Sequence, residues 1–215
     1  MKKTLLLLHI VLLVATSASA IGLSGKGVKA GLNLTRFTGD FYNKSEIILN
    51  YSGGVFIETP LSPEFAFQAE LLFMKKGDKE PVAGYMVDSL EFYYEDITKL
   101  TYLEIPLLVK YKTHTNGRLK PAVFAGPAVS WLINAVSDEY DSTIQEVAKA
   151  ADIRDDLKAL DLGIVVGAGF TYLTRPGHGV TFDIRYTLGM IKIDDTEGRS
   201  SARNIDIAIM VGYSF

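Results

Sequence analysis

The residue types that most often perform catalysis or bind metals are scarce in this chain of 215 residues. It has no cysteine, which excludes disulfides, thiolate zinc sites and cysteine nucleophiles. Histidine is the commonest general base, but His9 lies in an apolar N-terminal segment, and His114 and His178 lie in two separate short turns. No two histidines have the His-x-x-x-His spacing of a helical zinc site. We therefore expect a protein that is not an enzyme and has no catalytic residue, cofactor or metal site.

Charged residues are more numerous, with 22 Lys and Arg against 25 Asp and Glu. This mildly acidic balance argues against nucleic-acid binding, which normally requires a basic patch. Eight charged residues share the polar face of alternating segments: Lys29, Glu70, Glu104, Lys110, Asp161, Asp183, Arg185 and Asp206. They could form acid–base pairs or a proton path, but both signs are mixed, and buried charges need partners. We interpret them as a lumen charge network, in which Glu104 lies near Lys110 and Arg185 pairs with at least one aspartate.

The segments that carry these charges alternate between apolar and polar residues, which indicates β-strands with two different faces. The last segment, for example, places Ile207, Ile209 and Val211 opposite Asp206 and Ala208. The alternation predicts eight strands, over residues 28–35, 49–59, 64–74, 101–111, 120–132, 161–172, 180–189 and 204–215. The orientation of the fifth strand is open, because both of its faces are apolar.

The connections between these strands are alternately short and long. The short ones span residues 60–63, 113–118 and 174–178, and the long ones span 37–48, 75–100, 133–160 and 190–203. Short periplasmic turns and long external loops are typical of outer-membrane barrels. Lys76 would then lie in an external loop. In the third long loop, Ile144, Val147, Ala148 and Ala151 have helical spacing after a Ser142…Gln145 capping pair, which predicts a short helix.

The composition of the two faces indicates which one is inside. The polar face carries small residues that leave room for long charged ones in a narrow lumen: Gly31, Gly163, Gly167, Gly169, Gly189 and Gly212. The other face is apolar, with aromatic residues near the strand ends that suit an interfacial girdle: Phe65, Tyr111, Tyr172 and Tyr213 at one end, Tyr51 and Phe73 at the other. The pattern predicts an all-β fold, an eight-stranded antiparallel up-and-down transmembrane β-barrel, rather than a soluble barrel with an apolar interior.

Residues 1–20 have the layout of a secretory signal peptide. Lys2 and Lys3 precede the apolar run 5–14, and Ala18-Ser19-Ala20 forms a small-x-small cleavage site. We expect the mature barrel domain to span residues 21–215 and to lie in the outer membrane with both termini in the periplasm.

A set of short motifs in order along the chain carries a family resemblance. The motifs are Gly27-Val-Lys-Ala-Gly31-Leu-Asn33, Tyr102-Leu-Glu-Ile-Pro106, Pro121 with Ala125-Gly126-Pro127, Asp161-x-Gly163-x-x-x-Gly167-x-Gly169, Arg185-Tyr186-x-x-Gly189 and the terminal Tyr213-Ser-Phe215. Together they resemble the PorT-type outer-membrane β-barrel domain family, often labelled porin family proteins and abundant in Bacteroidetes. The resemblance implies an eight-stranded outer-membrane barrel, and PorT itself is associated with secretion and gliding machinery. Tyr213 and Phe215 also resemble the signal read by the barrel assembly machinery.

The function expected from these features is that of a non-enzymatic integral outer-membrane protein with a structural role or a binding role carried by its loops. A small-solute porin and an accessory of a secretion machinery are the alternatives. Eight strands enclose an interior that side chains just fill, which favours a closed barrel over a porin. The expected partners are outer-membrane lipid and lipopolysaccharide, the barrel assembly machinery, and an unknown external or secretion partner.

Overall fold

The computed structural model describes residues 25–39, 45–81, 85–87, 90–92, 94–113, 115–141, 146–194 and 202–215. The expected signal peptide, His9 and His114 lie outside this part of the chain. Eight long strands form the barrel: β1 (Gly25–Thr38), β2 (Ile48–Pro60), β3 (Phe65–Pro81), β6 (Tyr94–Lys112), β7 (Leu119–Asp141), β9 (Leu160–Arg175), β10 (His178–Gly189) and β11 (Arg203–Ser214).

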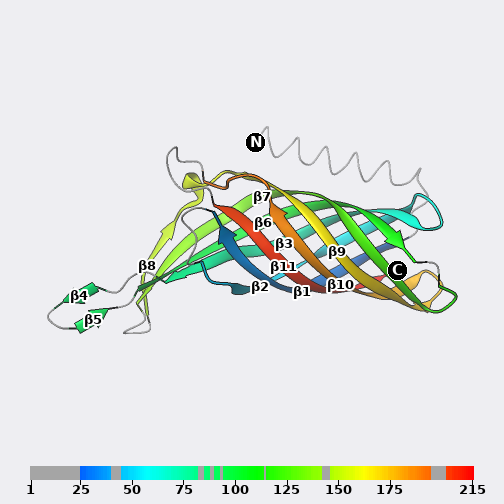
Figure 1. Ribbon diagram of the computed structural model, residues 1–215, viewed down its shortest axis with the longest axis horizontal. Coiled ribbons are helices and arrows are strands. Elements are labelled where there is room, and N and C mark those ends of the chain that lie inside the picture. Colours follow the sequence, from blue (N-terminus) through cyan, green and yellow to red (C-terminus); the bar gives the residue numbers. More distant parts are fainter. Residues whose placement is uncertain are drawn as a thin grey trace.

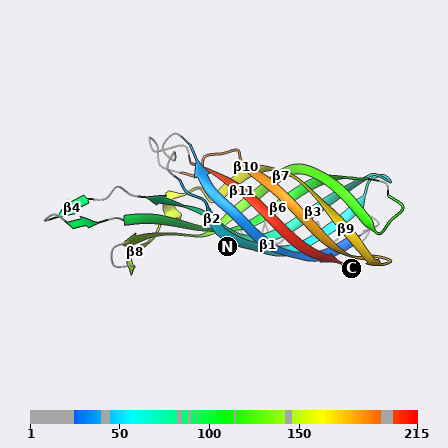
Figure 2. The ribbon, with the colours of Figure 1, turned by 60° about the horizontal axis from the view of Figure 1, so that its bottom comes forward.

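Each barrel strand pairs antiparallel with the next one along the chain, and β1 pairs with β11 (Figures 1 and 2). The β1–β11 register runs from Gly27↔Ser214 to Thr38↔Arg203, so the ring is closed along most of both strands. The predicted eight-stranded up-and-down antiparallel barrel is therefore confirmed. No helix among the described residues is long and apolar enough to cross a membrane.

Two of the expected long loops are instead paired strand extensions. β3 continues to Pro81 and pairs with β6 as far as Pro81↔Glu95, and β6 pairs with β7 as far as Tyr94↔Asp141. β8 (Glu146–Asp152) adds to the outer end of β7, while β4 (Tyr85–Val87) and β5 (Leu90–Phe92) form a separate two-stranded sheet. Figure 1 shows these segments projecting from the left end of the barrel. We call β8 and the parts of β3, β6 and β7 at residues 77–81, 94–100 and 134–141 the sheet extension.

The short helix expected in the third long loop is wrong for the described residues. Residues 146–152 form β8, which includes Val147, Ala148 and Ala151, and only η1 (Arg154–Asp156) makes a single 3-10 turn. Ser142, Ile144 and Gln145 lie outside the described residues. β8 pairs with β7 from Asp141↔Glu146 to Val136↔Asp152. Hydrogen bonding to the β7 edge outweighs the weak local preference for a helix.

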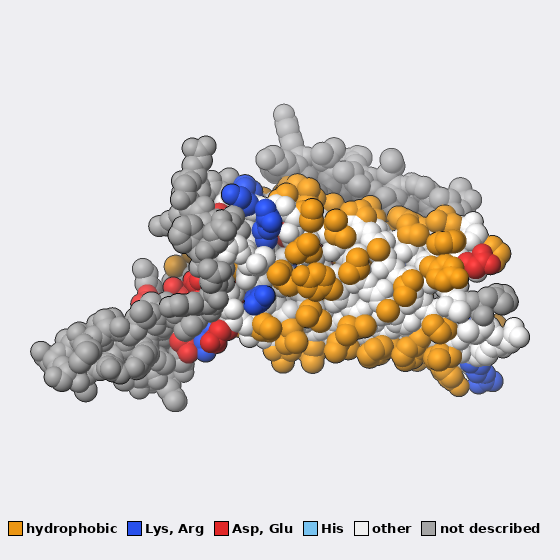
Figure 3. Space-filling model, viewed as in Figure 1, with side chains coloured by type: hydrophobic (Ala, Val, Ile, Leu, Met, Phe, Trp, Pro, Cys, Tyr) orange, Lys and Arg blue, Asp and Glu red, His pale blue; other side chains and the backbone are white. Residues whose placement is uncertain are grey.

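The two faces of the barrel have opposite chemistry. Apolar side chains point outward and are exposed, as for Leu32 (57%) and Val211 (53%). Figure 3 shows them in orange across the visible face of the barrel, with charged side chains near both of its ends. The orientation of β7, left open above, places Phe124 and Ser130 inside and Val123 outside. Inward apolar side chains form three buried clusters: Leu108–Phe124–Ala128–Val165, Leu72–Met74–Ala208–Met210 and Phe37–Leu100–Tyr102–Leu132–Ala135–Ile193–Ala202.

Candidate functional site

Four charged side chains meet in the middle of the lumen and form what we call the central cluster. Lys29 on β1 binds Glu70 on β3 and Asp183 on β10, with both Nζ–O distances at 2.8 Å. Arg185 on β10 binds Glu70 through two nitrogens, at 2.7 and 3.2 Å, and Asp183 at 3.1 Å. All four residues are buried, and two cations balance two anions. The central cluster is therefore neutral and tightly hydrogen-bonded.

Aromatic rings and a glycine shape the space around the central cluster. The Arg185 guanidinium lies 5.3 Å from the centre of the Phe124 ring, and the Lys29 ammonium lies 5.1 Å from that of Phe56. A Cβ atom added to Gly167 would lie 2.5 Å from the Phe124 ring. Glycine at this position therefore admits the ring on which Arg185 stacks, as the small residues of the polar face predicted.

A second cluster lies nearer the long-loop end and contains Lys76, Glu104, Asp161 and Asp206. Lys76 binds Glu104 at 2.6 Å, and the Ser130 hydroxyl donates to the same carboxylate oxygen at 2.8 Å. The placement of Lys76 in an external loop is thus wrong, because β3 carries it inward and leaves it only 2% exposed. The sequence contained a signal for this inward position, because the alternation of inward residues continues from Leu72 through Met74 to Lys76. The charged residues around Lys76 obscured that signal.

The second cluster differs in composition from the central one, since one ammonium faces three carboxyl groups. Asp161 accepts a hydrogen bond from the Asn204 amide at 2.7 Å. Asp206 is 1% exposed, and neither of its carboxylate oxygens has a hydrogen-bond partner within the described part of the chain. Arg185 pairs with Asp183, as expected, and with Glu70 across the lumen, but it forms no ion pair with Asp161 or Asp206 among the described residues.

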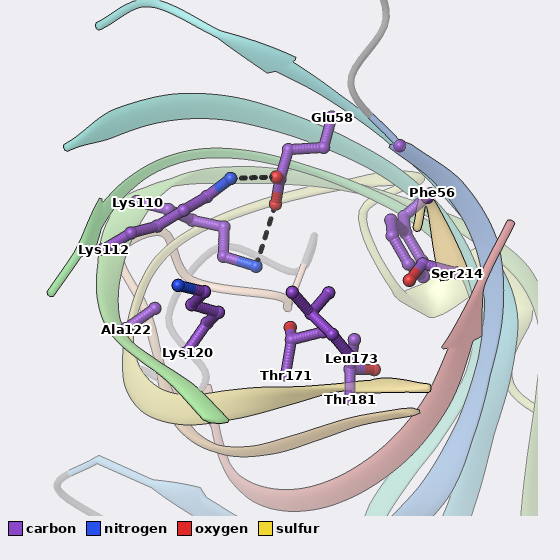
Figure 4. A pocket seen from close by; sticks show the side chains of 12 residues that line it. Phe56, Glu58, Lys110, Lys112, Lys120, Ala122, Thr171, Leu173, Thr181 and Ser214 are labelled. Atoms are coloured by element: carbon purple, nitrogen blue, oxygen red, sulfur yellow. Dashed lines mark hydrogen bonds and ion pairs between the residues drawn. The ribbon is translucent and has the colours of Figure 1, made fainter. Parts of the chain in front are cut away.

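The mouth of the barrel at the short-turn end contains an open pocket of about 250 Å³ (Figure 4). Its lining includes Glu58 from β2, Lys110 and Lys112 from β6, and Lys120 from β7. Lys110 lies 3.1 Å from Glu58 and donates to Gln68 at 2.9 Å, and Lys112 also binds Glu58. The expected proximity of Lys110 to Glu104 is therefore wrong: Lys110 pairs at the mouth, and Glu104 pairs deeper with Lys76. We call this pocket the basic vestibule.

Among the described residues, the opposite end of the lumen contains buried apolar side chains. Phe37, Tyr102 and Ile193 belong to the apolar cluster at this end, and Ile153 and Leu157 pack against it. Lys75 is the first charged residue of β3 that does not point into the lumen. Three residues further on, the side chain of Asp78 is buried on the sheet extension. Burial, together with the nearby Glu80 and Asp96, raises the pKa of Asp78 to about 7, despite a hydrogen bond from Ser45. Asp78 is therefore only partly ionised at neutral pH.

A closed eight-stranded antiparallel barrel with a charged interior and an apolar outer band agrees with the comparison to known families. Residues 21–195 match the family described as outer membrane protein beta-barrel domain. The chain belongs to this family. No curated protein matches it significantly.

Solved structures of outer-membrane barrels are similar to this family member in fold. Neisserial surface protein A (NspA) is 14% identical, with a TM-score of 0.50, and the match covers 90% of this chain and 99% of that one. OprG from Pseudomonas aeruginosa is 13% identical, with a TM-score of 0.47 and coverage of 91% and 98%. The family supports an outer-membrane location for this chain, and the match to NspA shows the shared fold. The matched family is broader than the PorT-type group.

The two residues of the expected assembly signal lie on the lipid-facing side of this outer-membrane barrel. Tyr213 and Phe215 are 38% and 47% exposed, and their rings lie 6.3 Å apart. The Phe215 amide donates to the Lys26 carbonyl at 2.8 Å, so the backbone hydrogen bonding between β1 and β11 continues one residue beyond the end of β11. His178 lies 3.3 Å from the Tyr213 hydroxyl rather than beside an acid of the lumen. In the described part of the chain, no group of three or more His, Asp or Glu residues could hold a metal ion.

Proposed function

We propose that this protein is a closed, non-enzymatic outer-membrane barrel whose function is to bind a partner through its sheet extension, not to transport solutes. The observation that carries the proposal is the continued pairing of β3, β6 and β7 beyond the apolar band. In this proposal the sheet extension faces the cell exterior, and the short turns and both termini face the periplasm. The alternation of short turns and long connections supports that orientation.

The filled lumen is the reason to prefer binding over transport. The central cluster and the three buried apolar clusters occupy the inside of the barrel. An interior of eight strands has little space beyond its side chains, whereas water-filled porins need sixteen strands or more. A steady open channel would require the central cluster to separate, which exposes strongly paired charges.

The edge of β8 suggests how a partner could bind. In the described residues, β8 pairs only with β7, and its other edge has no neighbouring strand. Free strand edges bind extended peptides by adding a strand to the sheet. If the resemblance to PorT-type barrels extends to function, this partner is a component of a secretion machinery and binds to the same edge of β8.

Conductance and crosslinking together test this function. In planar bilayers, the purified barrel should give no steady single-channel steps. A photocrosslinker placed at Lys99, which is exposed on the sheet extension, should form a discrete protein adduct in cells. The same crosslinker at lipid-facing Leu32 is the matched control and should give only lipid adducts. Large stable steps, or the same lipid adducts at both positions, would overturn the proposal.

A further inference from the structure

The basic vestibule has a composition suited to a ligand. Three ammonium groups, from Lys110, Lys112 and Lys120, line one side of the pocket together with a single carboxylate from Glu58 (Figure 4). Toward the opposite side lie the hydroxyl groups of Thr171, Thr181 and Ser214. Ammonium and hydroxyl groups are both hydrogen-bond donors, and such a set is complementary to an oxyanion.

The positive charge of the basic vestibule exceeds what Glu58 can balance. Glu58 already binds both Lys110 and Lys112. Lys120 donates to the backbone carbonyl of Thr115 and forms no ion pair with any described residue. Three ammonium groups against one carboxylate leave two positive charges in a half-buried mouth. Like charges repel strongly where water is partly excluded, so the arrangement gains stability when an anion enters.

The size of the pocket limits the class of anion. About 250 Å³ is below the usual range of roughly 300–1,000 Å³ for drug-sized ligands. A phosphate group fits this space and carries a charge of about −1.5 to −2 at neutral pH. That charge matches the two unbalanced lysines, whereas a single carboxylate would balance only one.

We propose that the basic vestibule is a binding site for a small phosphate-class dianion, held by Lys112 and Lys120 with Lys110 at its base. The ligand is either free inorganic phosphate or the phosphomonoester of a larger molecule that enters the mouth. Glu58 competes with the ligand for Lys110 and Lys112, so its carboxylate tunes the affinity. The site is separate from the sheet extension, which lies at the other end of the barrel, and does not depend on the function proposed for it.

The test is isothermal titration calorimetry of the folded barrel in detergent, with inorganic phosphate as the titrant and the ionic strength held constant. We expect saturable binding that Lys120→Gln and Lys112→Gln each weaken at least tenfold. Glu58→Gln should tighten binding several-fold, an effect that a merely structural ion pair would not give. Lys99→Gln, at the opposite end of the barrel, is the matched control and should leave the affinity unchanged.

A second arm identifies the source of the phosphate group. Short-chain phosphatidic acid, a lipid phosphomonoester, is titrated in place of inorganic phosphate, and tighter binding would assign the site to a headgroup. Folding of each variant is checked by the shift in gel mobility between boiled and unboiled samples. Absence of saturable binding of either probe would overturn the proposal. Equal weakening in Lys120→Gln and Lys99→Gln would also overturn it, since the anion would then be responding to overall charge only.

Discussion

Replacement of Arg185 by leucine tests how much the central cluster stabilises the closed barrel. The side chain is buried and donates to Glu70 at 2.7 and 3.2 Å and to Asp183 at 3.1 Å. Its removal leaves two carboxylates with one ammonium, that of Lys29, and therefore one uncompensated negative charge in the lumen. Removing one partner of a buried ion pair costs about 3–5 kcal/mol. Loss of the contact with the Phe124 ring acts in the same direction.

Urea unfolding of the barrel in lipid vesicles measures this cost. The chain has one tryptophan, Trp131, whose fluorescence reports unfolding without a label. The matched control is Lys99→Leu, because the Lys99–Asp138 pair is also short at 2.6 Å but its lysine side chain is 57% exposed. An exposed pair contributes about 0–1 kcal/mol. If the two variants lost the same free energy of unfolding, the central cluster would be solvated and the reasoning would fail.

A double variant separates charge balance from packing. Adding Asp183→Asn to Arg185→Leu leaves Lys29 opposite Glu70 as a one-to-one pair, so part of the lost stability should return. If none returned, the cost of Arg185→Leu would come from lost packing and not from the unbalanced charge.

Four further predictions follow from single residues. Ile207→Arg, on the lipid-facing side of β11, should cost about 2–4 kcal/mol of unfolding free energy if the site lies at the bilayer midplane, and a neutral result would mean that the faces are reversed. Asp206→Asn should leave stability unchanged or raise it, because both carboxylate oxygens lack a partner in the described structure; a large loss in urea unfolding would reveal a hidden one. The raised pKa of Asp78 means that the folded protein holds this proton more tightly, so stability should fall as the pH rises from 3.8 to about 7, and Asp78→Asn should remove that part of the pH profile. Deletion of Phe215 should lower the yield of folded barrel in an outer-membrane assembly assay, while wild-type yield would count against its role as an assembly signal.

The strands and the inward position of the charges could be predicted from the sequence because a membrane barrel imposes a strict period of two. Lys29, Glu70 and Arg185 all lie on the polar face of clear alternation, and all three point inward. The partner of Arg185 across the lumen could not be predicted, since it depends on the diameter and stagger of the ring and not on neighbouring strands. Glu70 lies on β3, several strands away from β10 around the ring.

The errors at the long-loop end have a different origin. Residues 75–80 read Lys-Lys-Gly-Asp-Lys-Glu, a composition typical of a loop, yet pairing with β6 keeps them in a strand. Beyond the bilayer, both faces of a strand can be polar, so alternation no longer separates strand from loop. The basic vestibule was missed for a related reason: Glu58, Lys112 and Lys120 come from three strands and meet only where the ends of those strands converge.

The central cluster also has a consequence for how the barrel forms. Lys29 is separated by 154 residues from Asp183, and Glu70 by 115 residues from Arg185, so these contacts join opposite ends of the chain. Contacts of such long sequence range form late and slow the overall reaction. β1 and β10 lie on either side of β11, so Lys29 and Asp183 come together only when the first and last strands join. A partly inserted sheet can form the Lys29–Glu70 and Arg185–Asp183 pairs, which lie 41 and 2 residues apart, but it lacks the two long-range pairs. The complete, neutral cluster forms only in the closed ring, so its long-range pairs make the final joining of β1 to β11 more cooperative and disfavour half-assembled intermediates in the membrane.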